Sequence, residues 1–169
     1  MGPHYLEHLF APQAIAVFGA SDKPDAVGAR VYQNLLHGGF TGSIYPVNPK
    51  YKKLGKAKCY ADIDAIKAHV DLAVIATPAG TVPDILHQCG EHGVRAAIIL
   101  SAGFTDNGQP NQLQQAMLQA ARQYGIRILG PNCLGLIRPG AGLNVTFSNN
   151  IAQSGKLALI SQSLSLIHI

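Results

Sequence analysis

The sequence contains no tryptophan and only three cysteines, and the shortage of cysteine excludes a large class of proteins. Cys59, Cys89 and Cys133 are too few and too unevenly spaced to form a disulfide framework or a metal site. An odd number of cysteines is also typical of a reducing compartment. We therefore expect a cytoplasmic protein without structural disulfides or a bound metal.

Long apolar runs are absent as well. No apolar stretch approaches the roughly 20 residues that a membrane-spanning helix needs. The N-terminus carries His4, Glu7 and His8 before any apolar stretch, which is unlike a secretory signal peptide. The sequence thus predicts no membrane partner.

Charged residues are scarce too, at 13% of the chain, and the net charge is only +4. Lysine and arginine do not gather into a face that would follow a nucleic-acid backbone, so we expect no nucleic-acid partner. The modest positive charge suits a small anionic ligand instead. Hydrophobic residues make up 47% of the 169 residues, which is enough for one well-packed domain.

Short apolar runs alternate with segments of helical periodicity along most of the chain. We expect strands at residues 15–18, 43–47, 71–76, 96–100 and 127–129. We expect helices at residues 28–37, 63–68, 82–92 and 112–124. Continuous apolar strands separated by amphipathic helices are typical of a parallel sheet covered on both faces. The predicted fold class is therefore α/β, a Rossmann-like doubly wound parallel sheet that binds ligands at the carboxyl ends of its strands.

The loop after the first strand has the composition of a phosphate-binding loop. It reads Gly19, Ala20 and Ser21, and Gly28 follows at the start of the next helix. Small residues let the backbone approach a ligand, and a helix N-terminus offers N–H groups to an anion. The spacing differs from the G-x-G-x-x-G pattern of dinucleotide-binding proteins. A loop that only turns the chain is the alternative.

The end of the second strand distinguishes best between possible cofactors. An NAD-binding domain usually has an acidic residue there to bind the ribose hydroxyls. This strand instead ends with Val47, Asn48, Pro49 and Lys50. A lysine at that place favours a phosphorylated ribose, as in coenzyme A or NADP. The alternative is a basic loop in solvent.

Three further loops fall at the same edge of the predicted sheet. They contain Thr77 and Pro78 after the third strand, Ser101 and Ala102 after the fourth, and Asn132 and Cys133 after the fifth. Together the loops predict a continuous ligand groove. Cys133 has no histidine tied to it in the sequence, so we interpret it as part of the wall of the groove. No residue is predicted to be catalytic.

The rhythm of strands and helices changes near residue 140. We expect a domain at 1–140, a linker with the first strand of a second domain at 141–163, and an extraneous tail at 164–169. The expected strand of the second domain lies at 156–160 and has no helix after it. The predicted domain organisation is one complete unit and the beginning of another.

Taken together, these segments resemble the N-terminal CoA-binding domain of NDP-forming acyl-CoA synthetases, which are relatives of the succinyl-CoA synthetase α subunit. They also resemble the protein lysine acetyltransferases that carry this region ahead of a GNAT domain. The resemblance covers nearly the whole chain up to Ser163. The matching segments are 9–12, 15–21, 46–50, 72–78, 98–104, 129–136, 142–144 with Phe147, and 155–163.

The resemblance implies that coenzyme A or an acyl-CoA lies along these loops. It implies that Ser21 and its neighbours, residues 48–50, Thr77, Pro78, Asn132 and Cys133 line the site. In that family the phosphohistidine belongs to the second domain, so no histidine of this chain receives that role, and the partners are downstream synthetase or GNAT domains. The alternatives are a stand-alone CoA-binding protein and an NADP-dependent oxidoreductase. The acyl group and the choice between a monomer and a homo-oligomer stay open.

Overall fold

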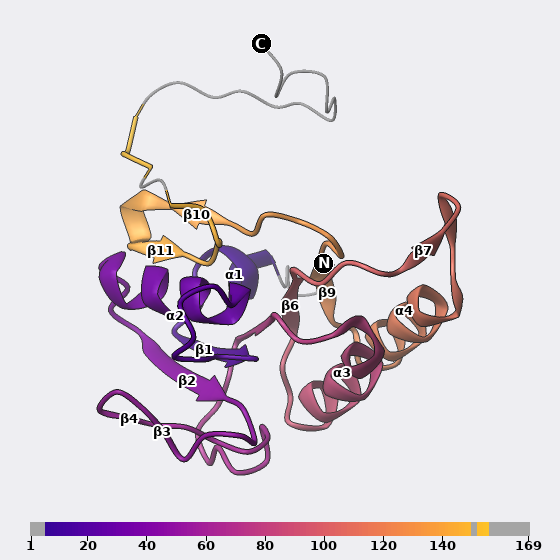
Figure 1. Cartoon of the computed structure of the whole chain (residues 1–169), viewed down its shortest axis with the longest axis horizontal. Helices are drawn as coiled ribbons and strands as arrows, with labels where there is room; N and C mark the ends of the chain where they lie inside the picture. The colour runs from indigo at the N-terminus through magenta and orange to yellow at the C-terminus, as the bar shows by residue number, and fades with distance from the viewer. Residues whose placement is uncertain (1–5, 150–151, 156–169) are drawn as a thin grey trace.

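Five short apolar runs form one parallel sheet in the computed structural model, which describes residues 6–149 and 152–155 (Figure 1). The spatial order is 2-1-3-4-5 when the five strands are numbered along the chain, and every neighbouring pair is parallel. This confirms the predicted α/β Rossmann-like sheet. In spatial order the strands are β2 (Ser43–Val47), β1 (Ala14–Phe18), β5 (Leu72–Ile75), β6 (Ala96–Ile99) and β9 (Arg127–Leu129).

The three central strands are buried along their whole length, whereas β2 and β9 form the partly exposed edges. A strand covered on both faces must be apolar at every position, and this explains why the central strands read as continuous apolar runs. The same pattern made them recognisable in the sequence.

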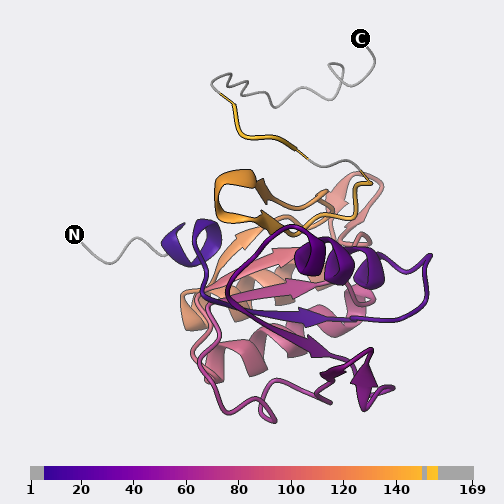
Figure 2. The same ribbon diagram turned by 90° about the vertical axis from the view of Figure 1, so that its left-hand side faces the viewer.

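One face of the sheet is covered by α3 (Val82–Glu91) and α4 (Gln112–Tyr124), which pack against each other (Figure 2). The start of α4 is fixed by Asn111, whose side chain accepts a hydrogen bond from the backbone N–H of Gln114. Its end is fixed by Gly125, which has a φ of 66°. Both helices begin and end close to the predicted residues.

The other face is covered by α2 (Val27–His37), the short α1 (Leu6–Phe10) and the segment 134–149. That segment contains β10 (Ile137–Arg138), the 3-10 turn η2 (Pro139–Ala141) and β11 (Leu143–Asn144).

Leu143 and Val145 are buried in the same core cluster as Leu35 of α2. The side-chain amide of Asn34 donates to the carbonyl oxygens of Thr146 and Ser148, at 2.7 and 2.9 Å. Part of the predicted linker thus packs on the sheet domain. The proposed division into two domains stays a prediction.

Several short elements were not expected from the sequence. Two small antiparallel hairpins project from the domain, and the 3-10 turn η1 (Ala79–Thr81) precedes α3. The first hairpin pairs β3 (Lys53–Leu54) with β4 (Ala57–Lys58), and the second pairs β7 (Thr105–Asp106) with β8 (Gln109–Pro110).

The predicted helix at 63–68 is wrong, because this segment consists of turns and bends. Ile63 and Ile66 are buried three residues apart, as in a helix, but a single turn is enough to place both in the core. One turn is too short to form a stable helix. The predicted strand at 156–160 and the tail at 164–169 lie outside the described residues. Within the described residues, no helix has the length and apolar character to cross a membrane.

Candidate functional site

Hydrogen bonds join the loops at the carboxyl edge of the sheet from one strand to the next. The side-chain amide of Asn48 donates to the carbonyl oxygen of Ala20 at 2.8 Å, linking the loops after β2 and β1. The hydroxyl of Ser101 donates to the carbonyl oxygen of Thr77, linking the loops after β6 and β5. The backbone N–H of Asn132 then donates to the carbonyl oxygen of Ser101 at 3.0 Å. These contacts link the loops of three neighbouring strand pairs, namely β2 with β1, β5 with β6, and β6 with β9.

Two glycines let the first loop pack closely on the start of α2. Gly19 has a φ of +83°, a conformation that residues with a side chain rarely adopt. A Cβ atom on Gly28 would lie 2.0 Å from the carbonyl oxygen of Gly19. The α2 N-terminus is thereby held against the loop. Ala26, the N-cap residue, supplies no side-chain hydrogen bond to the helix, and such an end is suited to an anion.

A cavity of about 550 Å³ opens beside these loops. It lies where the strand order reverses between β1 and β5, which is the usual ligand position in open parallel sheets. Three of the predicted loops, those after β1, β2 and β5, meet in its wall. The predicted residues that line it are Gly19, Ser21, Val47, Asn48, Pro49, Lys50, Thr77 and Pro78.

The loop after β2 is held in place by its own amide side chain. While its nitrogen donates to Ala20, the side-chain oxygen of Asn48 accepts from the backbone N–H of Lys50 at 3.0 Å. Asn48 therefore fixes the backbone that carries Lys50. Lys50 itself is exposed and lines the cavity.

Ser21 is buried and holds other lining residues of the cavity in place through its hydroxyl group. Its hydroxyl shares a hydrogen bond of 3.2 Å with the Tyr51 hydroxyl and accepts from the backbone N–H of Lys23 at 3.1 Å. Both of these partners also line the cavity, and both were missed by the sequence analysis.

A further group of lining residues comes from one face of α3 and its preceding turn. Thr81, Ile85 and Gln88 are spaced at i, i+4 and i+7, which places them on one side of a helix. This spacing is visible in the sequence, but only the position of α3 beside β5 shows which face meets the ligand site. Phe18, Ala26, Ala61, Asp62 and Ala76 complete the lining.

The other predicted site residues lie outside this cavity's lining. Ala20 belongs to the first loop but is fully buried and does not line the cavity. Ser101, Ala102 and Asn132 lie further along the same edge, on the loops after β6 and β9. The structure thus brings the first three predicted loops together around one cavity and sets the last two beside it.

The Cys133 thiol is directed into the protein. Its sulfur donates to the carbonyl oxygen of Ile99 at 3.4 Å, and burial raises the pKa of the thiol. A neutral thiol is a poor nucleophile. Cys133 does not line the cavity, so its expected place in the wall of the groove stays a prediction.

Comparison with known families gives one match over most of the chain. The family described as "CoA binding domain" matches residues 13–139, which include all five strands and every predicted site residue.

Curated relatives point in the same direction. The chain is 43% identical over 166 residues to the α subunit of acetate–CoA ligase (ADP-forming) I of Pyrococcus furiosus, covering 95% of this chain and 36% of that protein. It is 39% identical over 163 residues to acetate–CoA ligase (ADP-forming) I of Archaeoglobus fulgidus, covering 96% of this chain and 24% of that protein. The chain therefore spans only about a quarter to a third of these relatives.

A solved structure confirms the fold. The dinucleotide-forming acetyl-coenzyme A synthetase 1 of Candidatus Korarchaeum cryptofilum, in complex with phosphate and ADP, superimposes with a TM-score of 0.87 at 41% identity. The match covers 95% of this chain and 34% of that one. The family match, together with the acetate–CoA ligases among the relatives, supports coenzyme A as the ligand. This chain belongs to the CoA-binding domain family.

Proposed function

We propose that coenzyme A binds in the cavity bordered by the carboxyl ends of β2, β1 and β5. The observation that carries the proposal is the position of this cavity at the reversal of strand order. There the loops at 19–21, 47–50 and 77–78 surround a space of about 550 Å³. Pockets of this size and position bury a large part of a small ligand.

The chemistry of the lining suits a ligand with a phosphorylated and an apolar part. Lys23 and Lys50 supply positive charge at the cavity, and the α2 N-terminus beside Ala26 adds N–H groups. Phe18, Val47 and Ile85 offer apolar contact area. Coenzyme A combines phosphate groups with an adenine ring and a pantetheine arm, so it can use both kinds of surface.

The residue at the end of β2 does not favour NAD as the ligand. Asn48 stands where an acidic residue would bind the ribose hydroxyls, and its amide is engaged by the neighbouring loops. NADP shares the phosphorylated ribose with coenzyme A, but the family match and the relatives favour coenzyme A.

We further propose that these residues form the N-terminal part of an ADP-forming acyl-CoA synthetase. The identity to acetate–CoA ligases over at least 95% of the chain supports this assignment. In this proposal the remaining steps of acyl-CoA formation are carried out by segments that correspond to the other two thirds to three quarters of those relatives. An acyl-CoA-dependent acetyltransferase that uses the same domain as a sensor is the second candidate.

We also propose a cytoplasmic location. Cys59, Cys89 and Cys133 form no disulfide bonds, which is typical of proteins in a reducing compartment.

A ligand panel tests the site proposal. Isothermal titration of the 169-residue chain with coenzyme A, acetyl-CoA, NAD, NADP and ATP should give clear binding for the two CoA ligands. A domain that bound NAD or NADP and not coenzyme A would contradict it. Thr77→Ile, which adds bulk at the lining, should weaken coenzyme A binding, whereas Thr105→Ile in the remote β7–β8 hairpin should not.

The synthetase proposal needs the full-length protein. That protein should form acetyl-CoA, ADP and inorganic phosphate from acetate, coenzyme A and ATP. Acetyl transfer to lysine side chains without ADP formation would favour the acetyltransferase instead.

A further inference from the structure

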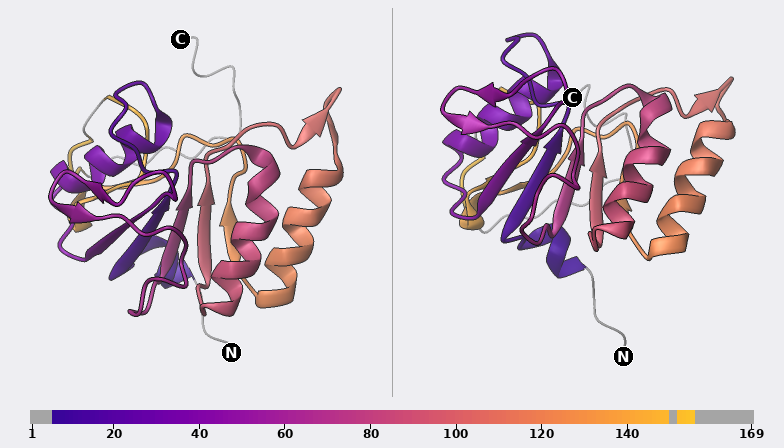
Figure 3. Two further views of the ribbon diagram at one scale, coloured as in Figure 1. Left: turned by 60° about the horizontal axis from the view of Figure 1, so that its bottom comes forward. Right: turned by 90° about the horizontal axis from the view of Figure 1, so that it is seen from below.

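A second cluster of chemically capable side chains lies at the opposite edge of the sheet. His8 belongs to α1, while His69 and Asp71 lie just before β5. α1 lies beneath the amino ends of the strands, away from the loops that surround the coenzyme cavity (Figure 3). The cluster is therefore separate from the proposed CoA site.

The three residues present their ligand atoms to one point. His8 Nδ1 and His69 Nε2 lie 3.1 and 3.2 Å from the same carboxylate oxygen, Oδ1 of Asp71. All three atoms lie within 4.8 Å of one another. Two imidazoles from distant parts of the chain thus converge on one oxygen.

Asp71 is also held in a fixed orientation. Its second oxygen, Oδ2, accepts hydrogen bonds from the backbone N–H groups of Gln13 and Ala14, at 2.7 and 3.0 Å. The carboxylate cannot rotate without breaking both bonds. Such outer hydrogen bonds orient a metal-binding carboxylate and leave its other oxygen for the ion.

The combination of two imidazoles and one carboxylate is a known ligand set for transition metals. In a tetrahedral zinc site with bonds of about 2.0–2.1 Å, neighbouring ligand atoms are about 3.3 Å apart. The two nitrogen–oxygen separations already match that value. The His69 side chain is 64% exposed, so it can adjust its ring and water can reach a fourth position.

We propose that His8, His69 and Asp71 form a binding site for a divalent transition-metal ion, with Zn²⁺ as the representative. The bound ion joins α1 to the segment before β5, and its coordination is completed by water. Hard ions such as Mg²⁺ and Ca²⁺ prefer sites built from oxygen ligands, which this cluster does not offer. The proposal is independent of coenzyme A binding.

Isothermal titration with ZnCl₂ tests the proposal. The metal-stripped 169-residue chain should bind one Zn²⁺ at this site and should not bind Mg²⁺. Even the residues that only orient a metal ligand are worth about 10–100-fold in metal affinity, so loss of a direct ligand should weaken binding by at least about tenfold. His69→Ala and His8→Ala should each show this loss, and their thermal stabilisation by Zn²⁺ should fall accordingly.

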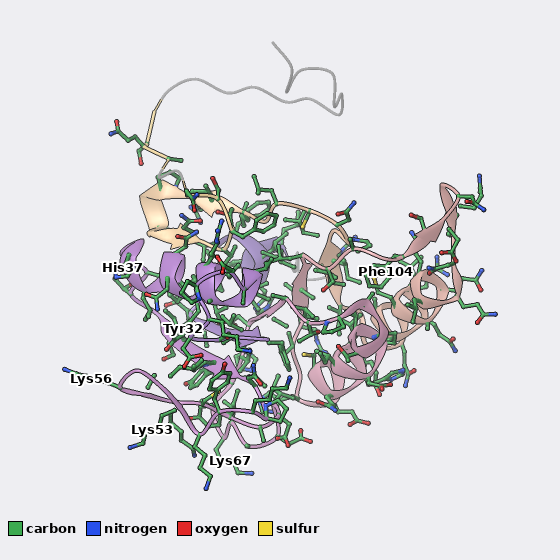
Figure 4. The ribbon with its side chains drawn as sticks, viewed as in Figure 1. Tyr32, His37, Lys53, Lys56, Lys67 and Phe104 are labelled. Atoms are coloured by element: carbon green, nitrogen blue, oxygen red, sulfur yellow. The ribbon has the colours of Figure 1, made fainter. Side chains whose placement is uncertain are left out.

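His37→Ala is the matched control, because His37 lies at the end of α2 on another part of the surface (Figure 4). This variant should bind Zn²⁺ like the unmodified chain. His69 is exposed, so its replacement leaves the folded structure intact and the result can be interpreted. Absence of Zn²⁺ binding, or equal affinity in His69→Ala and the unmodified chain, would overturn the proposal and leave the cluster as an ion pair.

Discussion

The two edges of the sheet differ in what surrounds the ends of β1 and β5. At the amino edge, Asp71 accepts the backbone N–H groups of Gln13 and Ala14, so the protein itself satisfies the start of β1. At the carboxyl edge, loops with glycine and small residues surround a cavity, and the α2 N-terminus adjoins it. At the amino edge the backbone N–H groups are thus satisfied by a carboxylate of the protein itself. At the carboxyl edge the cavity leaves room for the phosphate groups of a bound ligand.

This difference separates stability from binding along the same two strands. Changes at the amino edge should alter the free energy of unfolding and leave coenzyme A affinity unchanged. Changes on the cavity wall should alter affinity, and they should alter stability only where backbone packing is involved. Four substitution experiments, together with a pH profile, test this separation.

Gly28→Ala should cause the largest loss of stability, because the added Cβ would collide with the backbone of Gly19. The added Cβ would lie 2.0 Å from the Gly19 carbonyl oxygen and 2.7 Å from its carbon, and neither atom can rotate away. We expect unfolding in urea to show a loss of more than about 3 kcal/mol. Gly80→Ala is the control at the same edge, since its Cβ would meet nothing within 4 Å. Equal stability of the two variants would show that the loop is free to move away from α2.

Asp71→Ala should be next, with a loss of about 2–4 kcal/mol. It leaves the backbone N–H groups of Gln13 and Ala14 without their acceptor, and each unsatisfied group costs about 1–3 kcal/mol. Under folding conditions, calorimetry should still give the unmodified coenzyme A affinity. A marked loss of affinity would break the separation between the two edges.

The pH dependence of stability offers a gentler test of the same residue. Burial alone would raise the pKa of Asp71. The N–H groups of Gln13 and Ala14, the hydrogen bond with His8 and the charge of His69 together hold it below its ordinary value of 3.8. The unfolded chain therefore takes up the proton first as the pH falls. Stability should be complete well above pH 3.8 and should decrease as the pH drops through the folded pKa, and Asp71→Asn should remove this component.

Lys50→Ala should weaken coenzyme A binding by about tenfold to a hundredfold with little change in stability. A charge-assisted bond to a phosphate contributes roughly 1.5–3 kcal/mol, and each 1.4 kcal/mol is a factor of ten. Lys50 is exposed, so its removal disturbs no packing.

Dephospho-CoA shows which phosphate Lys50 meets. Dephospho-CoA lacks the 3′-phosphate of coenzyme A. If Lys50 binds that phosphate, the Lys50→Ala variant should bind coenzyme A and dephospho-CoA with equal affinity. If it binds the pyrophosphate, both ligands should weaken alike. Unchanged affinity for both would remove Lys50 from the site.

The smallest effect should come from the lysine-rich hairpin beside the cavity. Five of the eight lysines of the chain lie between residues 50 and 58, and Lys53 and Lys56 project from β3 and the turn that follows it (Figure 4). Replacing both with glutamine should slow coenzyme A association severalfold at low salt and leave dissociation unchanged. In stopped-flow measurements the difference should vanish at high salt. The control variant Arg122→Gln with Arg127→Gln removes the same amount of charge near β9. If it slowed coenzyme A association equally, the position of the lysines in the hairpin would have no influence on the association rate.

The sequence alone determined the five strands of the parallel sheet, most of the helices that cover it and the loops at its carboxyl edge. These features depend on local patterns, namely continuous apolar runs, helical spacing and glycine-containing turns. Parallel pairing then puts all five loops at one edge in any strand order. Lys50, which follows the second strand where NAD-binding domains usually have an acidic residue, also favoured a phosphorylated ribose. The helix expected at 63–68 failed because its two isoleucines need only one turn to reach the core.

Only the tertiary structure decided which loops form a cavity. The order 2-1-3-4-5 places the loops after β1, β2 and β5 together and leaves Ser101 and Asn132 beside them. The contribution of α3 through Ile85 and Gln88, and the meeting of His8 with Asp71, have the same origin. Strand order and helix placement arise from burial shared by segments far apart in the chain, and no local pattern records which segments will share it.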